Sequence, residues 1–128
     1  MKKLVLMALS CFCLTSLSAQ TDNNYKEKHP YKDWVKIAPQ FDDAFFKTPE
    51  ATRIADNVLL YQQTTGGWPK NIYMAAELNK KERAEALKMK ENVNLSTIDN
   101  KATITEINYL ARTYLATQDE KYKDAVLH

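Results

Sequence analysis

Residues 48–63 read TPEATRIADNVLLYQQ and contain the clearest helix of the chain. Thr48 is a good N-cap residue, Pro49 suits the first helical position, and Glu50 places an acid in the first turn. Apolar side chains then recur at the spacing of one helix face, made by Ala51, Ile54, Ala55, Val58 and Leu59, with Gln62 after them. The pattern predicts an amphipathic helix that runs to about Gln63 and is ended by Gly66-Gly67.

Helical patterns also flank this stretch. Residues 31–46 predict a short helix, a break at Pro39 and a second short helix. Residues 80–91 follow a capping box of Asn79 and Glu82, and their alternating charges favour a solvated helix over a basic binding site. Extended chain is expected only within residues 65–74, so the fold class is all-α.

The end of the chain predicts a helical hairpin. Asp99 or Asn100 is expected to cap the first helix, and Gln118-Asp119 separates it from a second helix that contains Tyr122, Ala125 and Val126. One face of the first helix is predicted to comprise Thr103, Ile107, Leu110, Ala111, Tyr114 and Leu115.

The first 19 residues are typical of a secretory signal peptide. Lys2 and Lys3 precede the apolar residues 4–14, and residues 17–19 form a cleavage site. The apolar run is shorter than the roughly 20 residues of a membrane span, so we expect no stable membrane insertion after cleavage. A membrane anchor, or a lipoprotein modified at Cys11 or Cys13, fits less well. The sequence predicts a secreted or periplasmic bacterial protein, with residues 20–33 as a flexible leader and 34–128 as one domain.

Composition narrows the possible partners. The chain has 18 basic and 16 acidic side chains. Loss of Lys2 and Lys3 leaves 18 − 2 = 16 basic against 16 acidic, a neutral mature chain without the basic excess that nucleic-acid binding needs. Both cysteines lie within the signal peptide, which leaves no disulfide and no thiolate metal site.

The motif GGWPKN, residues 66–71, holds both glycines of the chain. In one interpretation the glycines let a ligand approach the backbone, Trp68 stacks on a sugar ring, and Lys70 and Asn71 bind carboxylate and hydroxyl groups. In the other, the motif is a helix C-cap and Trp68 fills the core. The residues alone leave both open.

A second motif, STIDNKAT, occupies residues 96–103. Asp99 is either the N-cap of the following helix or a ligand of a hard cation such as Ca²⁺, which requires six to eight oxygens and so more than one carboxylate. Glu106 is expected to be a buried carboxylate that bonds a neighbouring helix. His29 and His128 are isolated, with no metal-ligand spacing.

Together, residues 51–74 and 95–128 resemble the N-terminal portion of the family 10 polysaccharide lyases, which are pectate lyases. The most specific parts are GGWPKN and the TIDN-x-AT-x-TEI-x-x-LA block, and the resemblance covers residues 34–128. It implies an incomplete α/α toroid of helical hairpins with an open cleft and a short irregular segment around GGWPKN. It also implies β-elimination of polygalacturonate or pectin oligosaccharides, with Ca²⁺ and an arginine base.

The same resemblance assigns roles to single residues. Asp99 matches the aspartate at the active centre, near calcium and substrate, and is the expected catalytic and metal-binding residue. The expected substrate-binding residues are Trp68, Lys70, Asn71, Asn100 and Thr103.

The chain departs from the family pattern in three respects. The family pattern has glycine where this chain has Lys101 and Gln118. The family domain is also longer, and its later half, with the arginine base, has no counterpart here. We therefore expect a chain truncated at its C-terminus that is weakly active or inactive alone.

Two other functions are weighed against the lyase. The first is a secreted helical module that binds glycans or partners without catalysis. The second is a helical-toroid glycoside hydrolase, which needs two carboxylates on opposite sides of a cleft. Asp99 and Glu106 are expected on one helix, so the hydrolase ranks last.

Overall fold

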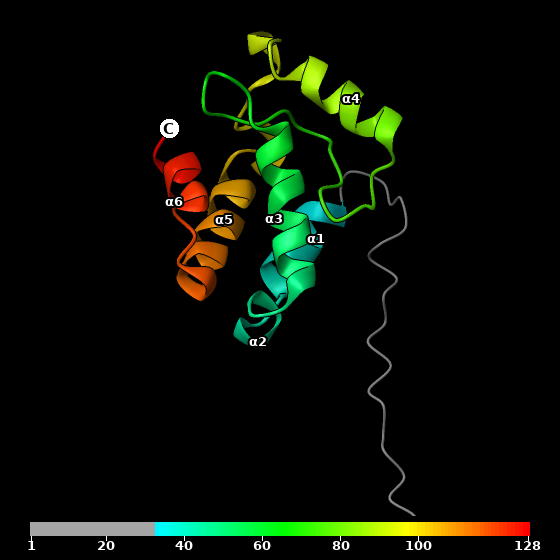
Figure 1. Cartoon of the computed structure of the whole chain (residues 1–128). Coiled ribbons are helices and arrows are strands. Elements are labelled where there is room, and N and C mark those ends of the chain that lie inside the picture. The colour runs from blue at the N-terminus through cyan, green and yellow to red at the C-terminus, as the bar shows by residue number, and fades with distance from the viewer. Residues whose placement is uncertain (1–32) are drawn as a thin grey trace, which may run out of the picture.

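The computed structural model describes residues 33–128, which form helices joined by irregular segments (Figure 1). Within them there is no strand, only one isolated antiparallel bridge between Pro69 and Ser96. The all-α prediction is therefore confirmed for these residues, whereas the predicted signal peptide and all but the last residue of the leader lie outside them. The elements are α1 (Trp34–Ile37), η3 (Ala38–Gln40), α2 (Asp43–Phe46), α3 (Pro49–Tyr61), α4 (Lys80–Met89), η4 (Val93–Leu95), η5 (Asp99–Lys101), α5 (Ile104–Thr117) and α6 (Glu120–Leu127).

Helix α3 begins as predicted, but it ends differently. Thr48 caps its first turn, since its hydroxyl accepts a hydrogen bond from the backbone N–H of Ala51. The helix ends at Tyr61, two residues before the predicted end, and Gly66-Gly67 follows only after a further turn. The side-chain ammonium of Lys90 instead caps the helix, because it donates to the carbonyl oxygens of Leu59 and Gln62, each at 3.0 Å. A cation suits the negative end of the helix dipole.

The predicted hairpin is confirmed as α5 and α6, which pack side by side and against α3 (Figure 1). Gln118 ends α5 in the left-handed conformation, and Asp119 caps α6. The predicted face of α5 is partly wrong, because Leu115 is 72% exposed. Helix α5 packs against α3 and α6 with a face other than the predicted one. Its buried residues are Thr105, Glu106, Tyr109, Leu110 and Thr113.

The two short helices α1 and α2 cover the core with aromatic rings. The predicted interruption at Pro39 is confirmed, because η3 and two extended residues, Phe41 and Asp42, separate the two helices. Tyr109 of α5 lies at the centre, with ring centroids 5.3 Å from Trp34 and 5.0 Å from Phe46. The tyrosine hydroxyl also donates to the carbonyl oxygen of Ala51 at 3.0 Å, which joins α5 to α3.

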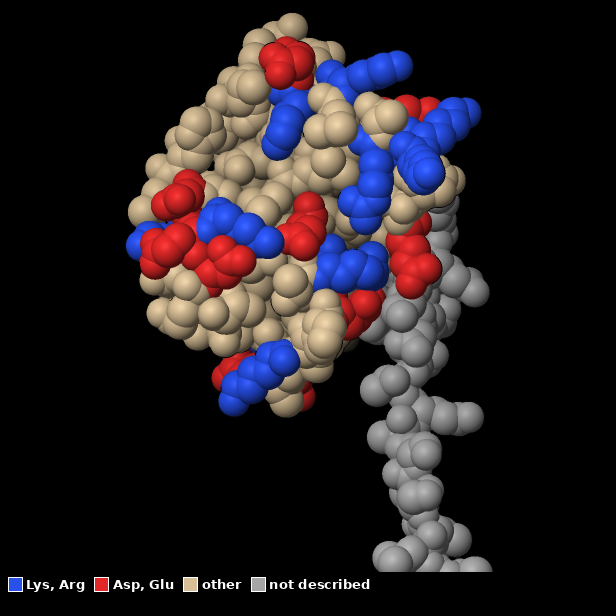
Figure 2. All heavy atoms as spheres, in the orientation of Figure 1, with Lys and Arg blue, Asp and Glu red and all other residues tan. Residues whose placement is uncertain are grey.

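Helix α4 contacts α3 but is mostly solvated. Its capping box of Asn79 and Glu82 is formed as predicted, and Ala86 is its one buried residue. Figure 2 shows lysine and arginine side chains over this part of the molecule, with acidic side chains nearby. In residues 33–128 no helix combines the length and apolar character needed to cross a bilayer.

Candidate functional site

The two glycines shape the loop between α3 and α4. Gly66 has a left-handed backbone with φ of 87°, and a Cβ there would lie 2.9 Å from the carbonyl carbon of His128. A Cβ on Gly67 would lie 3.1 Å from Cβ of Ser96. The first glycine therefore permits the backbone angle. The second lets the loop pack closely against the STIDNKAT segment, so neither serves as the predicted C-cap of α3.

Hydrogen bonds join the two sequence motifs. The backbone N–H of Trp68 donates to the Thr103 hydroxyl at 3.0 Å, and the N–H of Thr97 donates to the carbonyl of Trp68 at 3.1 Å. The Thr103 hydroxyl also donates to the carbonyl of Thr97 at 2.9 Å. Thr103 is an expected substrate-binding residue. In the structure its hydroxyl holds the two motifs together.

Trp68 is completely buried, with 0% of its surface exposed. Its indole N–H donates to the carbonyl oxygen of Val58 at 2.7 Å, which satisfies the polar atom inside the core. The interpretation of Trp68 as a core residue is therefore correct, and its prediction as a sugar-stacking surface is wrong. The loop turns this ring inward because its backbone is bonded to Thr97 and Thr103 on the adjacent segment.

Lys70 and Asp99 form an exposed ion pair at the junction of the motifs. The lysine ammonium lies 2.5 Å from Oδ2 of Asp99, and the two side chains are 44% and 59% exposed. The hydrogen bond and charge of Lys70 lower the pKa of Asp99 below its usual value, with a smaller contribution from the backbone N–H of Asn100. The prediction that Asp99 or Asn100 caps the following helix is wrong. Thr103 occupies that position, because a kink separates Asp99 from α5.

These residues do not complete a calcium site. Within residues 33–128, no three histidine, cysteine, aspartate or glutamate side chains gather closely enough to hold a metal ion. Asp99 offers one carboxylate, and the ammonium of Lys70 beside it would repel a cation. Ca²⁺ requires six to eight oxygen ligands, so Asp99 can supply only a small part of such a site.

Unusual backbone angles cluster at this junction. Left-handed φ values occur at five non-glycine residues of the described chain, and four of them lie here: Asn71, Asn100, Lys101 and Thr103. Such conformations cost free energy and concentrate at functional sites. The fifth is Gln118. Lys101 and Gln118 are also the positions where the resemblance to the family implies glycine, the residue that a positive φ favours.

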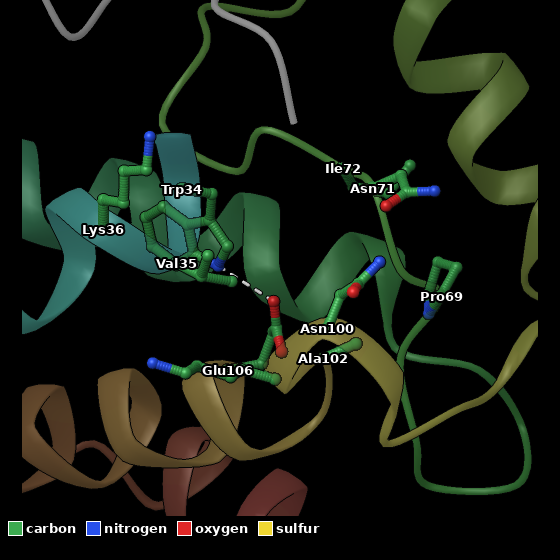
Figure 3. A pocket seen from close by; sticks show the side chains of 10 residues that line it. Trp34, Val35, Lys36, Pro69, Asn71, Ile72, Asn100, Ala102 and Glu106 are labelled. Atoms are coloured by element: carbon green, nitrogen blue, oxygen red, sulfur yellow. Dashed lines mark hydrogen bonds between the residues drawn. The ribbon is translucent and has the colours of Figure 1, made fainter. Parts of the chain in front are cut away.

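A pocket of about 290 Å³ lies beside the ion pair (Figure 3). The expected substrate-binding residues Asn71 and Asn100 line it, together with Pro69, Ile72, Lys101 and Ala102. Helix α1 supplies Trp34, Val35 and Lys36, and α5 supplies Glu106. Sequence analysis missed the contribution of α1, because nothing in residues 34–36 marks them as neighbours of the STIDNKAT segment.

Glu106 is buried at this pocket, with 2% of its surface exposed. Its Oε1 accepts a hydrogen bond from the indole N–H of Trp34 at 2.8 Å, which confirms the prediction of a buried carboxylate bonded to a neighbouring helix. Its Oε2 is closed off from solvent and accepts no hydrogen bond of good geometry, while the backbone N–H groups of Glu106 and Thr103 interact with the carboxylate. Burial raises the pKa of Glu106 above its usual value, because desolvation disfavours the charged form.

The model of the pectic acid lyase family matches residues 62–128, a stretch that contains both joined motifs. The chain belongs to the pectic acid lyase family. No curated protein and no solved structure matches the chain. The lyase family match begins after α3, so Trp34 and Lys36, which line the pocket, lie outside it.

The three arginines of this pectic acid lyase family member are at positions 53, 83 and 112. Arg53 binds Glu50 and the carbonyl oxygens of Ala75 and Ala76. Arg112 forms an ion pair with Asp43 and lies over the ring of Phe46 at 4.3 Å. Arg83 is exposed on α4, and none of the three lines the pocket beside Asp99.

Proposed function

We propose that the protein is a pectate lyase of polysaccharide lyase family 10, which cleaves polygalacturonate by β-elimination. One observation carries the proposal: the family match contains two motifs that the fold joins at an exposed, oppositely charged pair, Lys70 and Asp99. The proposal includes the incomplete α/α toroid expected from the resemblance. It also includes export by the signal peptide to the periplasm or the medium.

The reaction needs positive charge beside the substrate carboxylate. A base removes the C5 proton of a galacturonate unit, the electron pair forms the C4=C5 bond, and the C4–O bond breaks as the leaving oxygen takes up a proton. The C5 proton is only weakly acidic because the adjacent carboxylate is already negative. Cationic groups that neutralise this carboxylate stabilise the charge that develops in the transition state. Lys70, exposed at the junction, is the residue that we assign to this task.

Calcium dependence also belongs to the proposal. Bound Ca²⁺ would supply further positive charge at the uronate carboxylate. Asp99 is the protein carboxylate that we assign to it, and the remaining oxygens must come from elsewhere. The dependence is tested by adding a chelator and then restoring Ca²⁺.

The base is expected to lie outside the described residues. Arg53 and Arg112 are each held by carboxylates and other groups, and neither lines the pocket. Arg83 is exposed on α4 and does not line the pocket either. We therefore expect residues 20–128 alone to bind polygalacturonate but to release little unsaturated product.

The test combines binding and product measurements. Polygalacturonate is titrated into the purified protein with Ca²⁺ or with chelator, and ultraviolet absorbance follows the C4=C5 double bond of the product. We expect binding that requires Ca²⁺ and that weakens at least tenfold in Asp99→Asn. Asp124→Asn, which removes an exposed carboxylate from α6, should bind normally.

The outcomes separate the two main candidate functions. Binding that depends on neither Ca²⁺ nor Asp99 would refute the lyase site and favour the glycan-binding module. Rapid release of unsaturated product would support the lyase but refute our inference about the base.

A further inference from the structure

One face of α5 carries apolar side chains that stay exposed within residues 33–128. Ile104 and Leu115, near the two ends of the helix, are 55% and 72% exposed. The exposed Asn108 and the half-buried Ala111 lie between them. We call these four residues the outer face of α5. The opposite face, which includes Tyr109, is already buried in the core. A helix with apolar side chains on two opposite faces is normally covered on both, so the outer face is a candidate interaction surface.

A groove of about 620 Å³ lies along this face. Ile104, Ala111 and Leu115 line the groove from α5, and Ala38 and Pro39 line it from η3. The lining is mostly apolar, so a partner that fits the groove must present apolar side chains of its own.

The spacing of the outer face is that of a coiled-coil seam. Ile104, Asn108, Ala111 and Leu115 follow one another at steps of four, three and four residues. Alternating steps of this kind mark the a and d positions at which two helices pack together. A single asparagine at such a position, as at Asn108, sets the register of the pair. The outer face therefore suits another α-helix.

A second copy of the same helix completes this pattern. When two α5 helices run antiparallel about a two-fold axis at the middle of the outer face, Ile104 of each copy faces Leu115 of the other. Asn108 then faces Ala111, because both pairs of residues are centred on the same point of the helix. The small side chain of Ala111 leaves room for the asparagine. A two-fold interface requires this self-complementarity, in which one residue meets a second and the second meets the first.

The charges at the ends of the outer face agree with the same arrangement. The two-fold axis places Lys101 opposite Gln118 of the other copy, next to its Asp119. Lys101 is exposed and forms no ion pair within residues 33–128. Asp119 is half-exposed, and its ion pair with Lys121 is long, at 3.5 Å. The antiparallel pair thus gains opposite charges at both ends, whereas parallel helices would bring the two copies of Lys101 together.

We propose that the outer face of α5 binds a second copy of the chain, as an antiparallel two-fold pair of α5 helices. The inference does not depend on the proposed function. Asp99 lies just before α5, so the Lys70–Asp99 pairs of the two copies would lie at opposite ends of the paired helices. Only Ile104 and Leu115 contribute large apolar side chains to the layers, so we expect a weak dimer with a dissociation constant on the order of 0.1 mM.

Analytical ultracentrifugation of the purified mature protein tests for the dimer. Between about 10 μM and about 1 mM, the average mass should rise from that of one chain toward that of two. Leu115→Glu places a charge in each apolar layer and should weaken association roughly tenfold or more. Leu87→Glu changes an exposed leucine of α4, outside the outer face, and should leave association unchanged. Both leucines are exposed, so each variant should keep the fold, which circular dichroism checks.

Cysteine cross-linking then tests the antiparallel register. Cys11 and Cys13 lie within the predicted signal peptide, so the mature chain has no cysteine of its own. An equal mixture of Ile104→Cys and Leu115→Cys should form a disulfide between the two variants under mild oxidation, because the pairing brings these positions together. Each variant alone should cross-link much less. Mass spectrometry of the cross-linked peptides identifies the pair.

Three results would overturn the proposal. A protein that stays monomeric at about 1 mM would show that a second copy does not cover the outer face, and would point to another occupant, such as a later segment of a longer chain. A dimer that Leu115→Glu does not weaken would lie on a different surface. Stronger cross-linking of Ile104→Cys with itself than with Leu115→Cys would show a different register. None of these results depends on polygalacturonate binding, so the lyase proposal is tested separately.

Discussion

The Lys70 ammonium lies 2.5 Å from Oδ2 of Asp99, across 29 residues of sequence, and joins the GGWPKN and STIDNKAT motifs on the surface. This contact predicts a measurable change in acidity. In Lys70→Met, the pKa of Asp99 should rise back toward its usual value of 3.8, since the main cause of its lowering is removed. A carboxyl NMR titration measures this. Lys123→Met removes a lysine that pairs with Glu120, so it serves as the control and should leave the pKa of Asp99 unchanged. An unchanged Asp99 pKa in Lys70→Met would contradict the contact.

Lys101 and Gln118 are expected to destabilise the chain through their backbone angles. Their φ values of 63° and 58° are left-handed, which costs an ordinary residue about 1–2 kcal/mol, whereas glycine adopts them freely. Glycine also gives the unfolded chain more conformational entropy, which offsets part of this gain. Lys101→Gly and Gln118→Gly should therefore each raise the free energy of unfolding by about 0.5–1 kcal/mol. Urea denaturation measures this change.

A helical glycine substitution provides the matched control for this prediction. Ala111→Gly, within α5, should lower the free energy of unfolding by about 1 kcal/mol. A loss of stability at all three positions would show that the left-handed angles are not costly here.

Glu106 should make the fold less stable as the pH rises. Its pKa is raised in the folded state by burial, so the folded protein binds more protons than the unfolded chain between the usual value of 4.5 and the raised one. The free energy of unfolding should therefore fall as the pH increases through this window and be greatest below it. Glu106→Gln should lose this part of the pH dependence. Urea denaturation between about pH 4 and pH 8 tests this, and identical slopes for both proteins would contradict the prediction.

Trp68 should be needed for stability. Because it is fully buried, Trp68→Ala should lower the free energy of unfolding by about 3–5 kcal/mol. Trp68→Phe retains much of the packing but leaves the Val58 carbonyl without its donor, so we expect a smaller loss of about 1–3 kcal/mol. Thermal unfolding measures both. If the folded Trp68→Phe protein lost polygalacturonate binding at unchanged stability, the core assignment would be wrong.

Local signals in the sequence predicted much of the fold. Thr48 caps α3, Asn79 and Glu82 form a capping box, and Asp119 starts α6, because each depends on residues within one helical turn. The end of α3 was predicted less well. Lys90, which caps it, lies 28 residues beyond Gln62, and no local pattern indicates such a contact.

The candidate site depends on contacts that sequence patterns do not encode. Trp34 and Glu106 are 72 residues apart, so the sequence indicates a bond from Glu106 to a neighbouring helix but not that Trp34 is the partner. Asp99 was predicted as an N-cap because nothing indicates that lysine and threonine, at 101 and 103, adopt left-handed angles that delay the helix. The orientation of Trp68 was open for the same reason, since it follows from long-range bonds to Thr97 and Thr103.

The pocket draws its walls from three separate parts of the chain: α1, the GGWPKN loop, and residues 100–106. Unfolding separates these parts, so a small molecule that fits the pocket binds the native protein and not the unfolded chain. Such a molecule raises the melting temperature by mass action, with about 2.7 kcal/mol of added stability at a concentration 100 times its dissociation constant. The melting temperature therefore reports binding directly, and a thermal-shift screen of sugar acids can rank ligands without any turnover.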